Sequence, residues 1–228
     1  MDKRFMAILG AIVIIFIGIF AFSQHSSNNS SNSTGSSNTQ PTRHVEGQGS
    51  SGVTLVEYGD YECPICGIYY PVLKQVASQF NSQIYFQFRN LPLTAIHKNA
   101  FAAARAAEAA ALQDKFWQMH DKLYETQDPS GGSGWVASND PLGYFTTYAQ
   151  EIGLNVTKFK SDYASDKVNN LINADLNAFA KTNQEQATPT FFLDGKVLSN
   201  TNLTDPSTGQ PSATKFAAII NAEIVAKH

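Results

Sequence analysis

The sequence has few residues that could build a metal centre or a disulfide framework. Only two of its 228 residues are cysteine, and its five histidines include no pair with His-x3-His spacing. A zinc site needs four ligands and is therefore a weak alternative. Cys63 and Cys66 are separated by two residues, and a disulfide between them would constrain the unfolded chain little. We expect this pair to serve redox chemistry rather than stability.

An excess of positive charge is also lacking. Lys and Arg together number 16 against 19 Asp and Glu, a formal net charge of -3. The chain therefore has no excess of positive charge that could neutralise phosphates, and no nucleic-acid partner is expected. With 43% hydrophobic and 15% charged residues, the composition is that of a globular chain with one sizeable core.

Residues 5–22 are apolar and follow two basic residues. As a helix this run would be about 27 Å long, close to the roughly 30 Å thickness of the hydrocarbon layer. The next basic residue is Arg43, so the positive-inside rule places the N-terminus in the cytoplasm. We expect residues 1–22 to be a single-pass anchor in the cell membrane, with the catalytic domain extracytoplasmic. A cleaved signal peptide is the alternative, although its apolar region would be unusually long.

The chain after this segment begins with a polar stretch and then alternates strand and helix patterns. Residues 23–52 are mostly Ser, Asn, Thr, Gln and Gly, which predicts a flexible linker. A β-branched run at 53–58 predicts a buried strand, apolar spacings of three and four over 64–80 predict a helix, and 84–88 predict a second strand. This order favours a right-handed crossover with parallel strands.

Helical patterns then dominate residues 97–186, which predicts a helical insertion. The segment 190–198 contains two apolar runs around Asp194-Gly195, a strong hairpin signal. A final helix is expected at 213–226. The predicted fold class for residues 53–228 is α/β, with an all-helical domain inserted between the βαβ unit and the C-terminal hairpin and helix.

The cysteine pair occupies the start of the first predicted helix. Pro64 takes the first helical position, where its missing N–H costs nothing. The Cys63 sulfur should then face free backbone N–H groups, which stabilise a thiolate that attacks disulfides, while Cys66 resolves the mixed disulfide. A helix terminus contributes at most about 2 kcal/mol. One pKa unit is about 1.36 kcal/mol, so a large drop also requires direct hydrogen bonds.

The segment Glu57–Cys66, the helical region and Thr188-Pro189-Thr190 together resemble the DsbA-like family of exported thiol-disulfide oxidoreductases, over roughly residues 53–226. The resemblance implies a thioredoxin fold with a helical insertion and a cis-Pro189 loop beside the dithiol. The best-known bacterial members carry His where Ile65 stands here. A strongly oxidising potential therefore cannot simply be transferred to this chain.

Four residues beside the dithiol are expected to bind substrate. From sequence alone a Thr-Pro bond is ordinarily trans. The resemblance implies a cis bond, which would leave the Thr188 backbone free to pair with an extended substrate segment. The Thr188 hydroxyl is also expected near the sulfur of Cys63. The substrate-binding set is Pro64, Ile65, Thr188 and Pro189.

The catalytic set is Cys63, Cys66 and Glu57. Glu57 lies six residues before Cys63 in an otherwise apolar strand, where the resemblance implies a buried acid. Burial without a cation raises a carboxyl pKa, which suits a proton acceptor for the Cys66 thiol. The alternative is a Glu57 that faces solvent or pairs with a lysine.

Four further ionisable residues have no predicted catalytic role. Asp60 and Glu62 flank the redox motif and are expected to be solvated. His97 and His120 are expected on a helix surface or in the core with their polar atoms satisfied.

The predicted function is that of a thiol oxidase, which introduces disulfide bonds into secreted or surface proteins. Reduced or unfolded exported proteins are the expected substrates, and the resemblance implies a membrane redox partner of the DsbB-like or VKOR-like kind. No cofactor and no metal are expected, and the protein is expected to be monomeric. An extracytoplasmic reductase or isomerase is the alternative enzyme. A chaperone-like binding module, in which the dithiol only stabilises the fold, is the alternative from another class.

Overall fold

The computed structural model describes residues 40–227 of the chain. The predicted anchor at 1–22 and most of the predicted linker lie outside these residues. Within the described range, no helix is both long and apolar enough to cross a bilayer.

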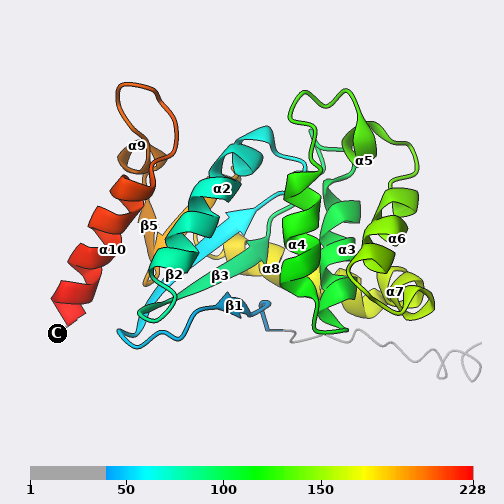
Figure 1. Cartoon of the computed structure of the whole chain (residues 1–228), viewed down its shortest axis with the longest axis horizontal. Coiled ribbons are helices and arrows are strands. Elements are labelled where there is room, and N and C mark those ends of the chain that lie inside the picture. The colour runs from blue at the N-terminus through cyan, green and yellow to red at the C-terminus, as the bar shows by residue number, and fades with distance from the viewer. Residues whose placement is uncertain (1–39, 228) are drawn as a thin grey trace, which may run out of the picture. The chain divides into compact units, whose positions relative to one another are not determined.

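Five strands form one mixed sheet in the order β1-β3-β2-β4-β5 (Figure 1). The predicted crossover is confirmed, because β2 and β3 are paired in parallel and α2 connects them along the chain. The predicted hairpin is confirmed as β4 and β5, with Asp194 and Gly195 at φ angles of +47° and +80° in its turn. Such positive φ angles are what a two-residue hairpin turn requires. The strands are β1 (His44–Glu46), β2 (Val53–Gly59), β3 (Ile84–Asn90), β4 (Thr190–Leu193) and β5 (Lys196–Leu198).

Two helices cover one face of the sheet. They are α2 (Pro64–Gln79) and the C-terminal α10 (Ala213–Lys227), which lie side by side in Figure 1. Leu73 of α2 and Phe216 and Ile220 of α10 are buried in one cluster with Val53 and Leu55 of β2. Pro71 lies inside α2. The short helix α9 (Asn200–Leu203) follows β5.

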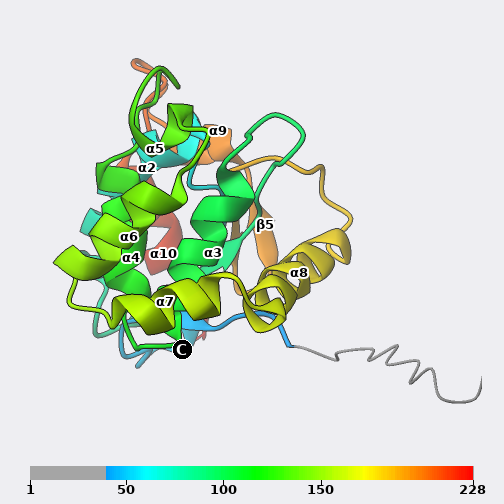
Figure 2. The same ribbon diagram turned by 90° about the vertical axis from the view of Figure 1, so that its right-hand side faces the viewer.

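The predicted helical insertion is confirmed between β3 and β4 (Figures 1 and 2). Its central helix α3 is rich in alanine and packs against α4, α7 and α8, since small side chains allow close approach. The last helix, α8, packs Phe179 against Tyr58 and Phe192 on the sheet face opposite α2. The insertion consists of α3 (Ala100–Ala111), α4 (Phe116–Glu125), α5 (Gly134–Ala137), α6 (Leu142–Glu151), α7 (Val156–Tyr163) and α8 (Asp166–Ala180).

The structure corrects the assignment of residues 40–52 to a flexible linker. β1 pairs antiparallel with β3 at the edge of the sheet. Thr42 is buried, and both its backbone N–H and its hydroxyl donate to the Asp175 carboxylate at 2.7 Å. The folded domain therefore begins before residue 53. The polar composition of this stretch concealed it, because its partners lie far away in the sequence.

Candidate active site: a dithiol at the start of α2

Cys63 is the residue that precedes α2, and its extended backbone (φ -68°, ψ 119°) turns the chain from the loop after β2 into the helix. Pro64 follows at the start of the helix, as predicted. Cys63 and Cys66 are present as two thiols, 5% and 0% exposed. Between them Ile65 is 49% exposed, so it presents an apolar surface directly beside the buried sulfurs.

The two thiols have opposite electrostatic environments. The pKa of Cys63 is lowered from 9.0 to about 6, first by a hydrogen bond from the Cys66 thiol and then by the Thr188 side chain and the backbone N–H groups of Cys66 and Ile65. Burial and the neighbouring Cys63 raise the pKa of Cys66 well above its ordinary value. The predicted backbone N–H contribution is present, but the Cys66 thiol is the larger cause. At neutral pH the site thus holds one thiolate nucleophile and one protonated thiol.

The Thr188-Pro189 bond is cis, and the loop containing it lies beside Cys63. The Cys63 sulfur lies 3.4 Å from the Thr188 carbonyl oxygen, to which it donates when it is protonated. The Thr188 hydroxyl, which was the expected contact, is buried and has no hydrogen-bond partner among residues 40–227, although its proximity helps to lower the pKa of Cys63. The Asn200 side chain donates to the Pro189 carbonyl at 3.0 Å and ties this loop to α9.

Glu57 lies on the face of β2 that faces α2, between Phe88 of β3 and Phe191 of β4. It is 2% exposed and forms no ion pair among residues 40–227, so the solvent-facing and lysine-paired alternatives are wrong. Burial, reinforced by the charge of Cys63, raises the pKa of Glu57 from 4.5 to about 8. A carboxyl with this pKa can give or take a proton near neutral pH.

Comparison with known proteins agrees with this geometry. A family model described as thioredoxin matches residues 39–210. The chain belongs to the thioredoxin family. Among solved structures, BdbD from Bacillus subtilis in its oxidised form is 25% identical, with a TM-score of 0.65 over 81% of this chain and 96% of that chain. A thioredoxin-like oxidoreductase from Silicibacter pomeroyi is 20% identical, with a TM-score of 0.63 over 81% and 93% of the two chains.

Curated relatives include much longer proteins. The Na(+)/H(+) antiporter NhaA 1 of Salinispora arenicola is 38% identical over 153 residues, which are 67% of this chain and 22% of the antiporter. The corresponding protein of Mycolicibacterium gilvum is 36% identical over 155 residues, 67% of this chain and 23% of its own. This thioredoxin-family chain therefore spans less than a quarter of the length of these relatives.

The acidic residues around the redox motif are buried rather than solvated, which corrects the sequence-based prediction. Asp60 is 1% exposed and accepts hydrogen bonds from the Leu93 N–H at 2.9 Å and from His97 at 2.7 Å. Glu62 accepts from the Asn99 N–H at 2.5 Å. Hydrogen bonding to Asp60 raises the pKa of His97. These pairs hold the loop after β3 against the turn that carries Cys63.

Gln127, which follows α4, is a positioning residue that the sequence did not reveal. Its side-chain nitrogen donates to the carbonyls of Tyr61 at 2.6 Å and Cys63 at 3.0 Å. A Cβ atom at Gly67 would lie 2.0 Å from the Gln127 side-chain oxygen, so glycine is required there for this contact. A lone glutamine in a loop carries no sequence signal. Its role arises because the insertion folds back onto the motif.

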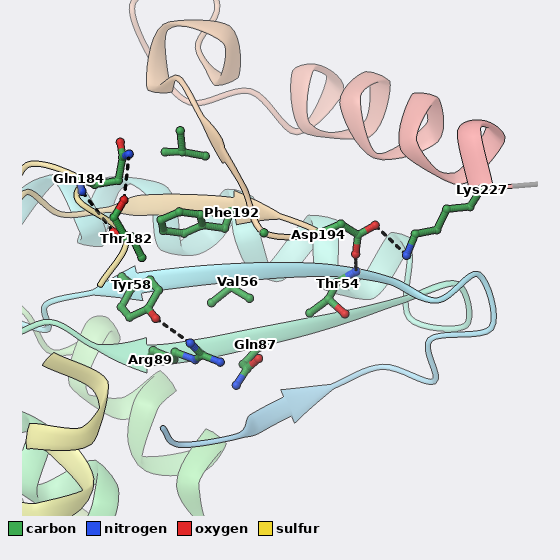
Figure 3. A pocket seen from close by; sticks show the side chains of 12 residues that line it. Thr54, Val56, Tyr58, Gln87, Arg89, Thr182, Gln184, Phe192, Asp194 and Lys227 are labelled. Atoms are coloured by element: carbon green, nitrogen blue, oxygen red, sulfur yellow. Dashed lines mark hydrogen bonds and ion pairs between the residues drawn. The ribbon is translucent and has the colours of Figure 1, made fainter. Parts of the chain in front are cut away.

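A separate pocket of about 680 Å³ lies on the sheet face away from Glu57 (Figure 3). Strand alternation directs Thr54, Val56 and Tyr58 to this face, and Arg89 donates to the Tyr58 hydroxyl at 2.6 Å. Neither cysteine lines it. Among residues 40–227, no group of three or more His, Cys, Asp or Glu side chains is arranged to hold a metal ion.

Proposed function

We propose that this protein is an extracytoplasmic thiol oxidase that transfers the Cys63-Cys66 disulfide to exported polypeptides. The observation that carries the proposal is the asymmetry of the two thiols, one with a lowered pKa at the helix start and one fully buried with a raised pKa. That asymmetry suits thiol-disulfide exchange, in which the outer sulfur bonds to substrate and the inner one resolves. A disulfide that only stabilised the fold would need neither the lowered pKa of Cys63 nor the raised pKa of Cys66.

Oxidation of a client proceeds in two exchanges. A client thiolate attacks the Cys63 sulfur, the Cys63-Cys66 bond breaks, and the electron pair remains on Cys66, which takes a proton from the Glu57 carboxyl. A second client thiolate then attacks the client sulfur of the mixed disulfide, and Cys63 leaves as a thiolate. The client gains one disulfide and the protein becomes a dithiol. Ile65 and the Thr188-Pro189 loop border the sulfur under attack and would align the client.

The lowered pKa of Cys63 favours the oxidising direction, because a stabilised thiolate stabilises the reduced protein. At pH 7, a shift of the Cys63 pKa from 9.0 to about 6 stabilises the dithiol by about 1.4 kcal/mol. This is an upper limit, because solvent screening reduces it. For a two-electron couple this corresponds to about 30 mV. Ile65 adds no charge, so we expect a moderately rather than strongly oxidising protein. An extracytoplasmic reductase is the alternative that so small a shift keeps open.

The return to the disulfide requires an electron acceptor, and we propose a DsbB-like or VKOR-like membrane protein. The apolar segment at 5–22 supports this proposal, because an anchored domain would work next to the bilayer. In this half of the cycle the Cys63 thiolate attacks the disulfide of the partner. The Glu57 carboxylate then accepts the Cys66 proton as Cys66 releases the partner in its reduced form.

The deciding experiment measures both activity and potential. The full-length protein should oxidise a reduced model protein, and Cys63→Ser should abolish this activity. Ser78→Ala, a substitution at an exposed position near the other end of α2, should retain it. Equilibration with glutathione should give a potential above the roughly -270 mV of thioredoxin. A lower potential together with insulin reduction would identify a reductase. Unchanged activity of Cys63→Ser would leave only the binding-module alternative.

A further inference from the structure

A small cavity lies between Glu57 and the helical insertion. Its volume is about 10 Å³, close to the minimum that one water molecule requires. Phe88 stands opposite Glu57 on β3, so no basic group from that neighbouring strand reaches the carboxyl. The cavity is lined by Glu57, by Glu46 of β1, by Tyr70, Leu73 and Lys74 of α2, by Phe86 of β3, and by Trp117, His120 and Tyr124 of α4.

His120 is the ionisable group on the far side of this cavity. It is 3% exposed, and its Nε2 atom is fully buried with no hydrogen-bond partner among the described residues. Its Nδ1 atom lies 3.2 Å from the Asp121 carboxylate, which accepts only, so Nδ1 carries the hydrogen and Nε2 is the acceptor. The rings of Phe88 and Trp117, with centroids 4.8 and 5.0 Å away, fix the imidazole.

The other end of His120 leads to solvent. The Asp121 side chain is 25% exposed, and Lys74, whose side chain is 43% exposed, donates to it at 2.7 Å. The Glu57 side chain forms no hydrogen bond within residues 40–227, yet the proposed reaction requires its carboxyl to exchange protons with bulk water. The chain of groups from Glu57 through the cavity to His120 and Asp121 connects the buried carboxyl to the surface of α4.

We propose that His120 is the proton relay between Glu57 and solvent. When Cys66 resolves a mixed disulfide, its proton passes to the Glu57 carboxylate and then, across one water in the cavity, to His120 Nε2, while the Nδ1 proton passes to Asp121 and solvent. The reverse sequence delivers a proton to Cys66 when it leaves during client oxidation. Only protons move in the relay, and the inference rests on the proposed dithiol chemistry.

The electrostatics around His120 are compatible with this role. Burial lowers the pKa of His120, whereas the bond to Asp121 raises it and the positive charge of Lys74 and the proximity of His44 lower it. The resting imidazole is therefore neutral at pH 7, as a relay requires. Glu46 and Tyr70 also border the cavity. Tyr124 has a buried hydroxyl without a partner among the described residues, but burial raises its pKa well above the ordinary value, so this hydroxyl does not exchange protons near neutral pH.

The test follows resolution directly in the full-length protein. Reduced protein is mixed with a chromophoric aromatic disulfide: the first phase reports attack by Cys63, and the second reports its displacement by Cys66. His120→Phe keeps an aromatic ring in the cluster and removes both nitrogens. It should leave the first phase and the thermal stability unchanged and slow the second phase about tenfold, which is less than the effect expected for a direct acid-base group. Asp121→Asn should slow the second phase to a smaller extent.

Two comparisons separate a relay from a packing defect. Trp135→Phe replaces a buried ring that does not line the cavity and whose N–H has no hydrogen-bond partner among the described residues. It should not affect the second phase. Glu57→Gln combined with His120→Phe should be no slower than Glu57→Gln alone, because a relay acts only through the carboxyl.

Normal resolution in His120→Phe, an equal loss in Trp135→Phe, or independent effects of the two cavity substitutions would overturn the inference. If His120→Phe unfolds, His120→Gln provides the same comparison. Absence of the first phase in the wild type would instead refute the proposed function.

Discussion

Replacing Glu57 by Gln should stabilise the protein at neutral pH while slowing its chemistry. The folded protein holds the Glu57 proton until about pH 8, whereas the unfolded chain releases it near 4.5. Between these values the folded state binds more protons, so its stability falls as pH rises. Gln keeps the shape of the protonated acid and does not titrate. The variant should therefore avoid the loss.

The size of the effect follows from the two pKa values. At pH 7 the protonated folded carboxyl competes with an unfolded carboxylate, and the difference amounts to about 3 kcal/mol. Glu57→Gln should gain this amount at pH 7 and nothing near pH 4.5, with a slope of about 1.4 kcal/mol per pH unit between. For a domain of this size the gain at pH 7 corresponds to a melting temperature higher by roughly 6–12 °C.

Urea unfolding from pH 4.5 to pH 8 measures the difference in the free energy of unfolding between Glu57→Gln and the wild type. The gain should be smaller in the disulfide form, because the Cys63 thiolate contributes to the raised pKa of Glu57. Glu46→Gln is a matched control: this carboxyl borders the same cavity, but it is only partly buried and lies near Lys74, so its replacement should change stability less. A Glu57→Gln gain that does not vary with pH, or a loss at pH 7, would refute the assignment of a buried, protonated Glu57.

Three further outcomes are expected. Thiolate absorbance should titrate with a midpoint near pH 6 for Cys63, and Cys66→Ser should raise it by weakening the largest contribution; a midpoint above 8 would contradict the site description. His97→Gln should destabilise the protein below pH 6.5, where the pairing of protonated His97 with Asp60 is complete, and the difference measured by urea unfolding should shrink as pH rises through the elevated pKa. A chain starting at residue 53 should be less stable than one starting at 40, by roughly 1–3 kcal/mol in chemical denaturation, because a buried carboxylate loses its two Thr42 donors.

The local sequence determined the elements that local physics controls. Runs of β-branched and apolar residues and helical apolar spacings located β2, α2, β3 and the helical insertion, and Asp194-Gly195 marked a turn whose φ angles few other residue pairs adopt. The dithiol was identifiable because its two sulfurs and the helix start are adjacent in sequence. Glu57 was identifiable because a single acid in an apolar strand stands out, although only the structure showed that it is buried.

The remaining features depend on residues that meet only after folding. β1 forms because a three-residue strand finds β3 and because Thr42 reaches Asp175, 133 positions away. Asp60 and Glu62 carry charges that composition assigns to solvent, and partners on the loop after β3 determine their burial. Gln127 and His120 have no local pattern, since each obtains its role from the fold of the insertion against the motif. Sequence thus determined which atoms can react, whereas tertiary packing decided their pKa values and proton paths, because burial and long-range contacts set these quantities.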